Sequence, residues 1–138
     1  MGPVEAIQSV VRNYANFAGR ATRPEYWWWA LFQVVSSVVL GQIPVLGQLW
    51  SLVILLPSLA VGVRRLHDVG RSGWLILLPW AGLPFVLLGG AIQGGILEPV
   101  GYVVIFCGAL AVLVWACMDG TPGPNGYGPD PKGRGGRR

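Results

Sequence analysis

Charged residues lie in short clusters along the chain, and two long apolar runs separate the clusters. No charged residue occurs between Glu25 and Arg64, and Glu98 is the only one between Arg71 and Asp119. A single helix through the first run would be about 57 Å long at about 1.5 Å per residue, whereas a bilayer core is about 30 Å thick and is crossed by about 20 residues. Each run is therefore predicted to fold back on itself and to form two transmembrane helices.

Glycine and proline mark the expected turn in each run, at Gly41-Gln42-Ile43-Pro44 and within 93–99, because both residues break helices. The predicted fold is all-α: a polytopic membrane protein with four transmembrane helices as two hairpins, preceded by a short amphipathic helix. The predicted parts are an N-terminal amphipathic segment (1–21), a four-span membrane domain (22–118, with spans at about 24–42, 45–65, 73–92 and 99–118) and a Gly/Pro-rich basic cytoplasmic tail (119–138).

Composition excludes two other classes of protein. Hydrophobic residues make up 53% of the chain and charged residues 12%, against about 25% charged in soluble domains. A disordered chain has low hydrophobicity and high net charge, and an ordinary soluble enzyme needs more charge to cover its water-facing surface. The first apolar run begins only after Glu25 and lacks a small-residue cleavage site, so no cleavable signal peptide is expected.

The distribution of Lys and Arg predicts the orientation. With four spans, all ten fall on one side: Arg12, Arg20 and Arg23 before the first span, Arg64, Arg65 and Arg71 between the second and third, and Lys132, Arg134, Arg137 and Arg138 after the fourth. Such an excess is typical of cytoplasmic segments. Both termini and the 64–72 loop are therefore predicted to be cytoplasmic. The same bias accounts for the net charge of +4, so no nucleic-acid partner is expected.

Local patterns near the first span predict three further features. Apolar residues at helical spacing predict an amphipathic helix that buries the stripe Val4, Ile7, Val11 and Tyr14. Thr22 and Glu25 are spaced as a capping box. Three consecutive tryptophans at 27–29 point about 100° apart on a helix, so they are interpreted as an aromatic belt at the headgroup level.

The densest polar motif is Arg64-Arg65-Leu66-His67-Asp68-Val69-Gly70-Arg71-Ser72-Gly73-Trp74. In a structural interpretation, Asp68 lies within ion-pair reach of Arg64 and Arg71, and Gly70 ends the helix in a left-handed cap. In a functional interpretation, these groups converge with Arg20, Arg23 and Glu25 at the cytoplasmic end. Arginine forks there would bind the phosphate of a lipid headgroup or another phosphorylated ligand, and His67 would gate the site.

The tail is rich in Gly and Pro, which predicts turns and extended chain rather than helix. Asn125 and Asp130 are expected to close local turns on the backbone. Tyr127 is expected to dock on the 64–72 loop or on the membrane face. The last seven residues are interpreted as a loose basic end that is attracted to anionic lipid.

Three motifs in this order resemble a known family. They are Tyr14-x-x-Phe17-x-Gly19-Arg20-x-x-Arg23-x-Glu25-Tyr26-Trp27, the Arg64–Trp74 loop and Asn125-x-Tyr127-Gly128-Pro129-Asp130. They resemble the bacterial domain-of-unknown-function 805 family, the YhaH-like small inner-membrane proteins, over about residues 10–131. Gly126 and Pro24 depart from the family's pattern, which has a basic residue at the first position and a polar or basic one at the second. The resemblance implies a four-span inner-membrane protein and supplies no activity.

The function predicted from these observations is a non-enzymatic module whose cytoplasmic face binds anionic lipid headgroups or a partner protein, with a homo-oligomer as one form of partner. A small transporter or channel built around a third span kinked at Pro79 and Pro84 is the alternative. No catalytic residue, metal site or cofactor is expected, since no nucleophile has a defined partner. The candidate binding residues are Arg20, Arg23, Glu25, Arg64, Arg65, His67, Asp68, Arg71, Asn125, Tyr127 and Asp130.

Overall fold

The structure, a computed structural model, describes residues 1–134 as helices joined by loops and followed by a non-helical tail. In chain order the elements are α1 (Pro3–Arg12), α2 (Arg23–Leu40), α3 (Pro44–Asp68), the 3-10 helix η1 (Gly73–Gly82), α4 (Leu83–Ile92) and α5 (Leu97–Cys117). Within the described range, the extended chain amounts to an isolated bridge between Asn125 and Gly128. The predicted all-α class is confirmed.

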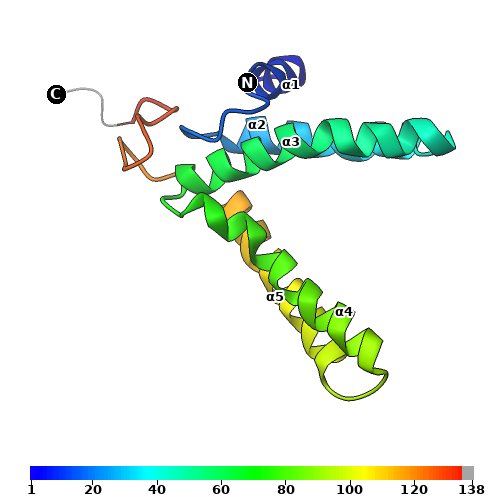
Figure 1. Cartoon of the computed structure of the whole chain (residues 1–138). Helices are drawn as coiled ribbons and strands as arrows, with labels where there is room; N and C mark the ends of the chain where they lie inside the picture. The colour runs from blue at the N-terminus through cyan, green and yellow to red at the C-terminus, as the bar shows by residue number, and fades with distance from the viewer. Residues whose placement is uncertain (135–138) are drawn as a thin grey trace.

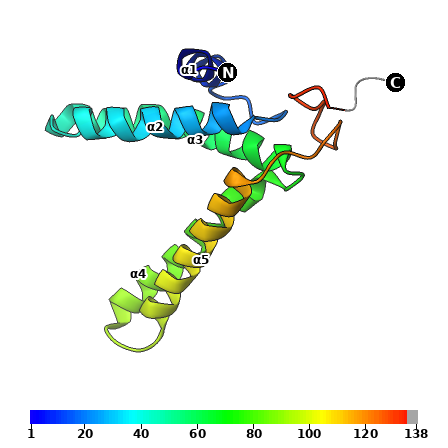
Figure 2. The ribbon, with the colours of Figure 1, turned by 180° about the vertical axis from the view of Figure 1, so that it is seen from behind.

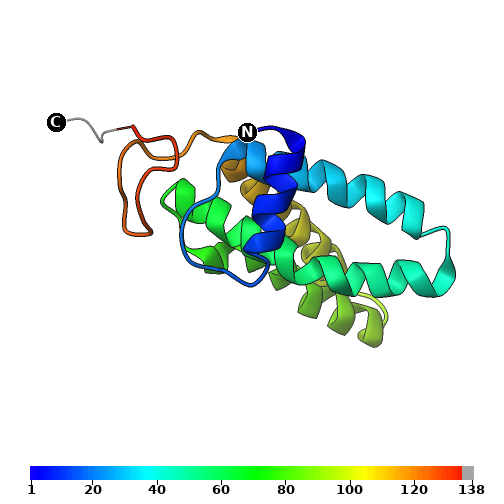
Figure 3. The ribbon, with the colours of Figure 1, turned by 90° about the horizontal axis from the view of Figure 1, so that it is seen from above.

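The helices form two pairs that meet at one end (Figures 1 and 2). In the first pair, α2 and α3 run side by side in opposite directions; in the second, η1 and α4 together run alongside α5. The pairs diverge from the junction between α3 and η1, so the loops at 41–43 and 93–96 lie at the two far ends. Helix α1 lies across the first pair, and the chain after α5 folds beside the junction (Figure 3).

Within residues 1–134, three helices are long and apolar enough to cross a membrane: Pro44–Asp68, Gly73–Ile92 and Leu97–Cys117. Many of their large apolar side chains are exposed, as is expected of a surface that contacts lipid rather than water. Helix α2 does not reach the same hydropathy, because Arg23, Glu25 and Gln33 lie within its 18 residues.

The segment predicted as the third span changes helix type along its length. Its first ten residues, η1, form a 3-10 helix, and α4 continues from Leu83. A 3-10 helix of this length is uncommon. Pro79 and Pro84 have no N–H to donate to the carbonyls four residues earlier, so the α-helical ladder is interrupted twice here. The prolines therefore change the winding of this segment, where a simple bend was predicted.

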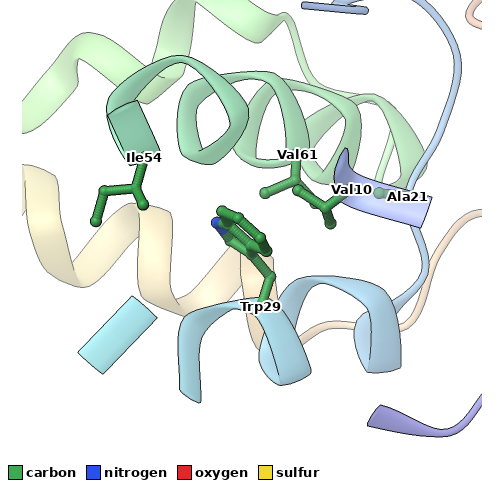
Figure 4. Close-up of a cluster of buried hydrophobic side chains, with 5 residues drawn as sticks. All are labelled: Val10, Ala21, Trp29, Ile54 and Val61. Carbon is green, nitrogen blue, oxygen red and sulfur yellow. The ribbon is translucent and has the colours of Figure 1, made fainter. Parts of the chain in front are cut away.

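The core of the first pair is built around Trp29, whose side chain is only 4% exposed. Its ring packs with Ile54 and Val61 of α3, Val10 of α1 and Ala21 (Figure 4). The indole N–H donates to Ser58 Oγ at 2.9 Å, and Ser58 donates to Gln33 Oε1 at 3.0 Å. The interpretation of all three tryptophans as an interfacial belt was wrong for Trp29. The rotation of about 100° per residue turns this third ring toward α3, while Trp27 and Trp28 stay exposed.

Helix α1 packs through a different face from the predicted one. Its buried residues are Ala6 and Val10, and Ile7 packs beside them. Val4, Val11 and Tyr14 are exposed, so the prediction that they form the buried stripe was wrong. Small Ala6 and neighbouring Val10 lie one helical turn apart on the face that meets the first pair.

Glycines allow the helices of the second pair to approach closely. A Cβ at Gly101 of α5 would lie 2.7 Å from Val86 N, and a Cβ at Gly108 would lie 2.7 Å from Pro79 N. Gly82 and Gly89 are similarly confined by the backbone of α5. Close backbone approach at small residues is a recurrent mode of helix packing in membranes.

Candidate functional site

The candidate site begins at the last turn of α3, which ends in the predicted left-handed cap. Gly70 has a φ of 75°. Its N–H donates to His67 O at 3.0 Å, and Arg71 N–H donates to Leu66 O at 2.9 Å. This pair of hydrogen bonds is a Schellman motif. It stops the helix directly after Asp68 and keeps the 64–68 turn at the junction of the two helix pairs.

Asp68 is the centre of a buried ion cluster. Arg20 Nε lies 2.8 Å from Asp68 Oδ1, and Arg65 Nη1 donates to Asp68 Oδ2. The three side chains are at most 2% exposed. The prediction that Asp68 pairs with Arg64 and Arg71 was wrong. Arg64 points to α2 instead, and Arg71 lies beyond the cap, where it is exposed.

Backbone carbonyls from three segments complete the bonding of these two arginines. Arg20 donates to Thr121 O at 2.6 Å and to Gly123 O at 2.7 Å. Arg65 donates to Ala116 O at 3.2 Å, to Ala21 O at 3.1 Å and to Met118 O. Most of their N–H groups are therefore used inside the protein. Arg20 and Arg65 were candidate ligands for a lipid headgroup, but both are buried and already bonded to groups of the protein.

The tail is tied to Asp68 as well. Thr121 N donates to Asp68 O at 2.8 Å. A Cβ at Gly120 would overlap the Asp68 carboxylate, so glycine is required where the tail passes over this group. The sequence pattern indicated turns here, but it did not indicate this contact.

Arg64 and Glu25 form a second buried pair at the base of α1. Arg64 Nη1 lies 2.9 Å from Glu25 Oε1, which also accepts a hydrogen bond from Ser9 Oγ at 2.9 Å. Thr22 caps α2 through Glu25 N at 3.4 Å. The reciprocal half of the predicted capping box is absent from the described residues, because the Glu25 carboxylate binds Arg64 and Ser9. Within residues 1–134, Arg64 Nε and Nη2 have no partner.

His67 and Tyr127 form a stacked pair on the other side of the 64–68 turn. Their rings are 4.0 Å apart and inclined by 3°. His67 Nδ1 lies 3.0 Å from Gly19 O, and Asn125 Nδ2 donates to His67 O at 2.9 Å. The predicted docking of Tyr127 on the 64–72 loop is confirmed. The two rings lie at a pocket of about 490 Å³.

The predicted turns at Asn125 and Asp130 are confirmed. Asn125 Oδ1 accepts from Tyr127 N at 2.9 Å, and Asp130 Oδ1 accepts from Lys132 N at 2.9 Å. Asp130 Oδ2 accepts from Gly123 N and from Arg134 Nε. Burial works against the charge of Asp130, but the hydrogen bonds from Lys132 N, Arg134 and Gly123 N lower the pKa of its carboxyl well below the ordinary range.

Asp119 joins the start of the tail to its end, which the sequence analysis missed. It lies 2.6 Å from Lys132 Nζ and 2.8 Å from Arg134 Nη1. The hydrogen bond from Lys132 and the charge of Arg134 lower the pKa of Asp119 to about 2. The interpretation of the basic end as loose was therefore wrong for Lys132 and Arg134. Arg137 and Arg138 lie outside the described residues.

Acid is expected to release the tail. The pKa values of Asp119 and Asp130 lie below the value of about 3.9 for an unperturbed Asp. Their bonds therefore contribute stability above about pH 4, and that contribution is lost as the pH falls through the folded-state pKa values. Hydrogen exchange over residues 119–131, corrected for the intrinsic rate, should rise sharply only below about pH 3. In Asp130→Asn it should already be raised at pH 7; protection that is constant down to pH 1.5 would contradict this expectation.

Two of the candidate arginines remain at the surface. Arg71 is exposed, with its guanidinium 5.5 Å from the centre of the Trp115 ring. The Arg23 side chain is 43% exposed and lies 3.7 Å from Asp119. These cations, unlike Arg20 and Arg65, can reach a ligand outside the protein. Among residues 1–134, no group of three or more His, Cys, Asp or Glu side chains is placed to hold a metal ion.

Comparison with known proteins identifies relatives along most of the chain. The family described as "Protein of unknown function (DUF805)" matches residues 14–44 and 41–129. Inner membrane protein YhaI of Escherichia coli (strain K12) is 37% identical over 132 residues, which cover 90% of this chain and 92% of YhaI. Inner membrane protein YhaH of the same organism is 33% identical over 135 residues, which cover 89% and 93%. No solved structure matches.

Proposed function

This chain belongs to the DUF805 family of proteins of unknown function, and we propose that it is an inner-membrane protein with four transmembrane helices and both termini in the cytoplasm. Its relatives YhaI and YhaH are named as inner membrane proteins. Helix α2 is the fourth crossing. Its 18 residues span about 27 Å at about 1.5 Å per residue, which is close to the thickness of a bilayer core.

The orientation is supported by the position of the cations. Those at 20–23, at 64–71 and at 132–134 all belong to the junction of the helix pairs or to the tail beside it, whereas the loops at 41–43 and 93–96 lie at the far ends (Figure 1). Lys and Arg favour the cytoplasmic side. The junction is therefore the cytoplasmic end of the molecule.

A reporter that is active only in the periplasm tests this topology. Inserted at Gly94 or Gln42, between the helices of each pair, it is expected to be active. Inserted at Gly70 or fused after Arg138, it is expected to be inactive, because those positions lie at the cytoplasmic end. Activity at Gly70, with insertion into the membrane preserved, would overturn the proposed orientation.

The cytoplasmic end is a non-enzymatic surface that binds anionic lipid headgroups. The observation that carries this proposal is that some of its arginines are buried and bonded inside the protein, whereas others are exposed. Arg20 is buried and holds the tail, Arg65 is buried and holds the end of α5, and Arg23 and Arg71 are exposed. Guanidinium groups suit phosphate, and cations beside a membrane surface each contribute about 1 kcal/mol of attraction to anionic lipid.

Replacing both exposed arginines, in Arg23→Gln/Arg71→Gln, is expected to weaken phosphatidylglycerol binding by about thirtyfold, since two cations contribute about 2 kcal/mol and about 1.4 kcal/mol corresponds to a factor of ten. The measurement is equilibrium binding of fluorescent phosphatidylglycerol to the detergent-solubilised protein, with phosphatidylcholine as the neutral comparison. Gln42→Ala, at the far end of the first pair, is the matched control and should bind as the unaltered chain does. Equal binding of both lipids would instead favour a protein partner for this surface.

A further inference from the structure

The pocket beside His67 and Tyr127 is separate from both buried ion clusters and from the exposed arginines. Its volume of about 490 Å³ lies within the range of about 300–1,000 Å³ that is common for sites of small molecules. The loop before α2 contributes Phe17, α3 contributes one of its faces, and η1 and the tail contribute further lining residues. No Lys or Arg is among the described residues that line it.

The lining changes from apolar to polar along α3. Leu59, Val63 and His67 are spaced four residues apart and share one face of the helix. They span about 12 Å at about 1.5 Å per residue. Ile76 and Leu77 of η1 add further apolar wall. Since α3 ends at the proposed cytoplasmic surface, the apolar part of the pocket lies deeper in the bilayer and His67 lies near the interface.

At the polar end of the pocket, Nε2 of His67 is the nitrogen that can bond to a ligand. The carbonyl of Gly19 only accepts hydrogen bonds, so Nδ1 is the donor in their 3.0 Å contact. In the neutral ring, Nε2 is then an acceptor. Gly73 allows η1 to pack closely against this part of α3, because a Cβ there would lie 3.1 Å from Nε2 and 2.5 Å from Val63 Cγ1. Among residues 1–134, Nε2 has no hydrogen-bond partner, and His67 is one of the residues that line the pocket.

The tail fixes the remaining wall. Tyr127 stacks on the His67 ring. Asn125, two residues earlier, donates to His67 O and holds this part of the tail against the end of α3. Ser72 and Tyr127, which both carry hydroxyl groups, also line the pocket. The cluster at Asp68 that anchors the tail therefore also keeps the pocket closed on this side.

We propose that this pocket binds one long-chain fatty acid. The carboxyl group and His67 Nε2 share one proton in a hydrogen bond, and the chain lies along Val63 and Leu59. The volume of about 490 Å³ suits one chain rather than two, and a lining without Lys or Arg suits a carboxyl group better than a phosphate. The proposal rests on the proposed insertion of α3 into the membrane, and it is independent of headgroup binding at Arg23 and Arg71.

The test uses the purified full-length chain in detergent and palmitic acid that carries a photoreactive diazirine near the end of its chain. Labelling should concentrate on peptides that contain the pocket residues and should be displaced by unlabelled palmitic acid. Leu77→Trp fills the pocket and is expected to reduce palmitic acid affinity at least tenfold. Leu87→Trp, on the exposed surface of α4, is the matched control and should leave the affinity unchanged.

His67→Phe keeps an aromatic ring for Tyr127 but removes Nε2, and it is expected to reduce palmitic acid affinity at least fivefold while hexadecane binding stays the same. Should this variant fail to fold, the comparison of Leu77→Trp with Leu87→Trp decides the proposal. Equal displacement by hexadecane, or equal loss in Leu77→Trp and Leu87→Trp, would overturn it. Displacement by phosphatidylglycerol that depends on Arg71 would assign the labelling to the headgroup surface instead.

Discussion

Replacing Asp68 by alanine is expected to lower the free energy of unfolding by about 3–5 kcal/mol, the usual cost of removing one partner from a buried ion pair. The substitution leaves the guanidinium group of Arg65 without a carboxylate partner and that of Arg20 with only Asp130, which lies 4.0 Å from Nη2, and both arginines are almost fully buried. Because Arg20 also holds carbonyls of the tail and Arg65 holds one at the end of α5, the tail should detach. Denaturant titration of the detergent-solubilised protein, followed by circular dichroism, measures the loss.

The matched control for Asp68→Ala is Asp119→Ala. Asp119 also pairs with cations, but its side chain is 49% exposed, and exposed ion pairs contribute little to stability. This variant should lose only a small fraction of what Asp68→Ala loses. Losses of equal size would mean that burial is not what makes the Asp68 cluster important.

A methyl group at Gly89 is expected to lower the free energy of unfolding by about 1–3 kcal/mol, the range for overpacked sites. Its Cβ would lie 2.8 Å from Glu98 Cα at the start of α5. A backbone atom cannot move aside as a flexible side chain can, so α4 and α5 must separate along their length. Thermal unfolding of Gly89→Ala, monitored by circular dichroism, measures the effect.

The neighbouring Gly90 provides the control, since a Cβ there meets nothing within 4 Å. Gly90→Ala should be neutral or should raise the stability by about 0.5–1 kcal/mol, because alanine favours the helical conformation more than glycine does. Opposite outcomes at adjacent positions separate helix packing from helix propensity. A loss at Gly90→Ala as large as that at Gly89→Ala would show that packing against α5 is not the cause.

Local features of the structure follow from the sequence where neighbouring residues alone determine them. The left-handed cap at Gly70 needs only a residue without a Cβ after the last turn. The turns at Asn125 and Asp130 need only a short side chain that can accept from a backbone N–H two residues later. The break between α2 and α3 falls within 41–43, where glycine and proline interrupt the apolar run.

The partners of the polar residues did not follow from the sequence, because they depend on which helix faces meet. Asp68 was assigned to Arg64 and Arg71 by spacing along one helix, but Arg20, 48 residues away, takes one of its oxygens. Apolar periodicity is also less informative in a membrane protein. Lipid and core both favour apolar side chains, so Val11 looks as suitable for burial as Val10, and only Val10 is buried.

The contacts between Asp68 and the tail have a consequence for biosynthesis. Arg20 and Arg65 leave the ribosome well before the carbonyls at 116–123 that bind them, since a chain is made from its N-terminus. During translation these two guanidinium groups must stay hydrated at the membrane surface. The two guanidinium groups are therefore buried late in maturation, after the C-terminal part of the chain has been made and α5 has been inserted.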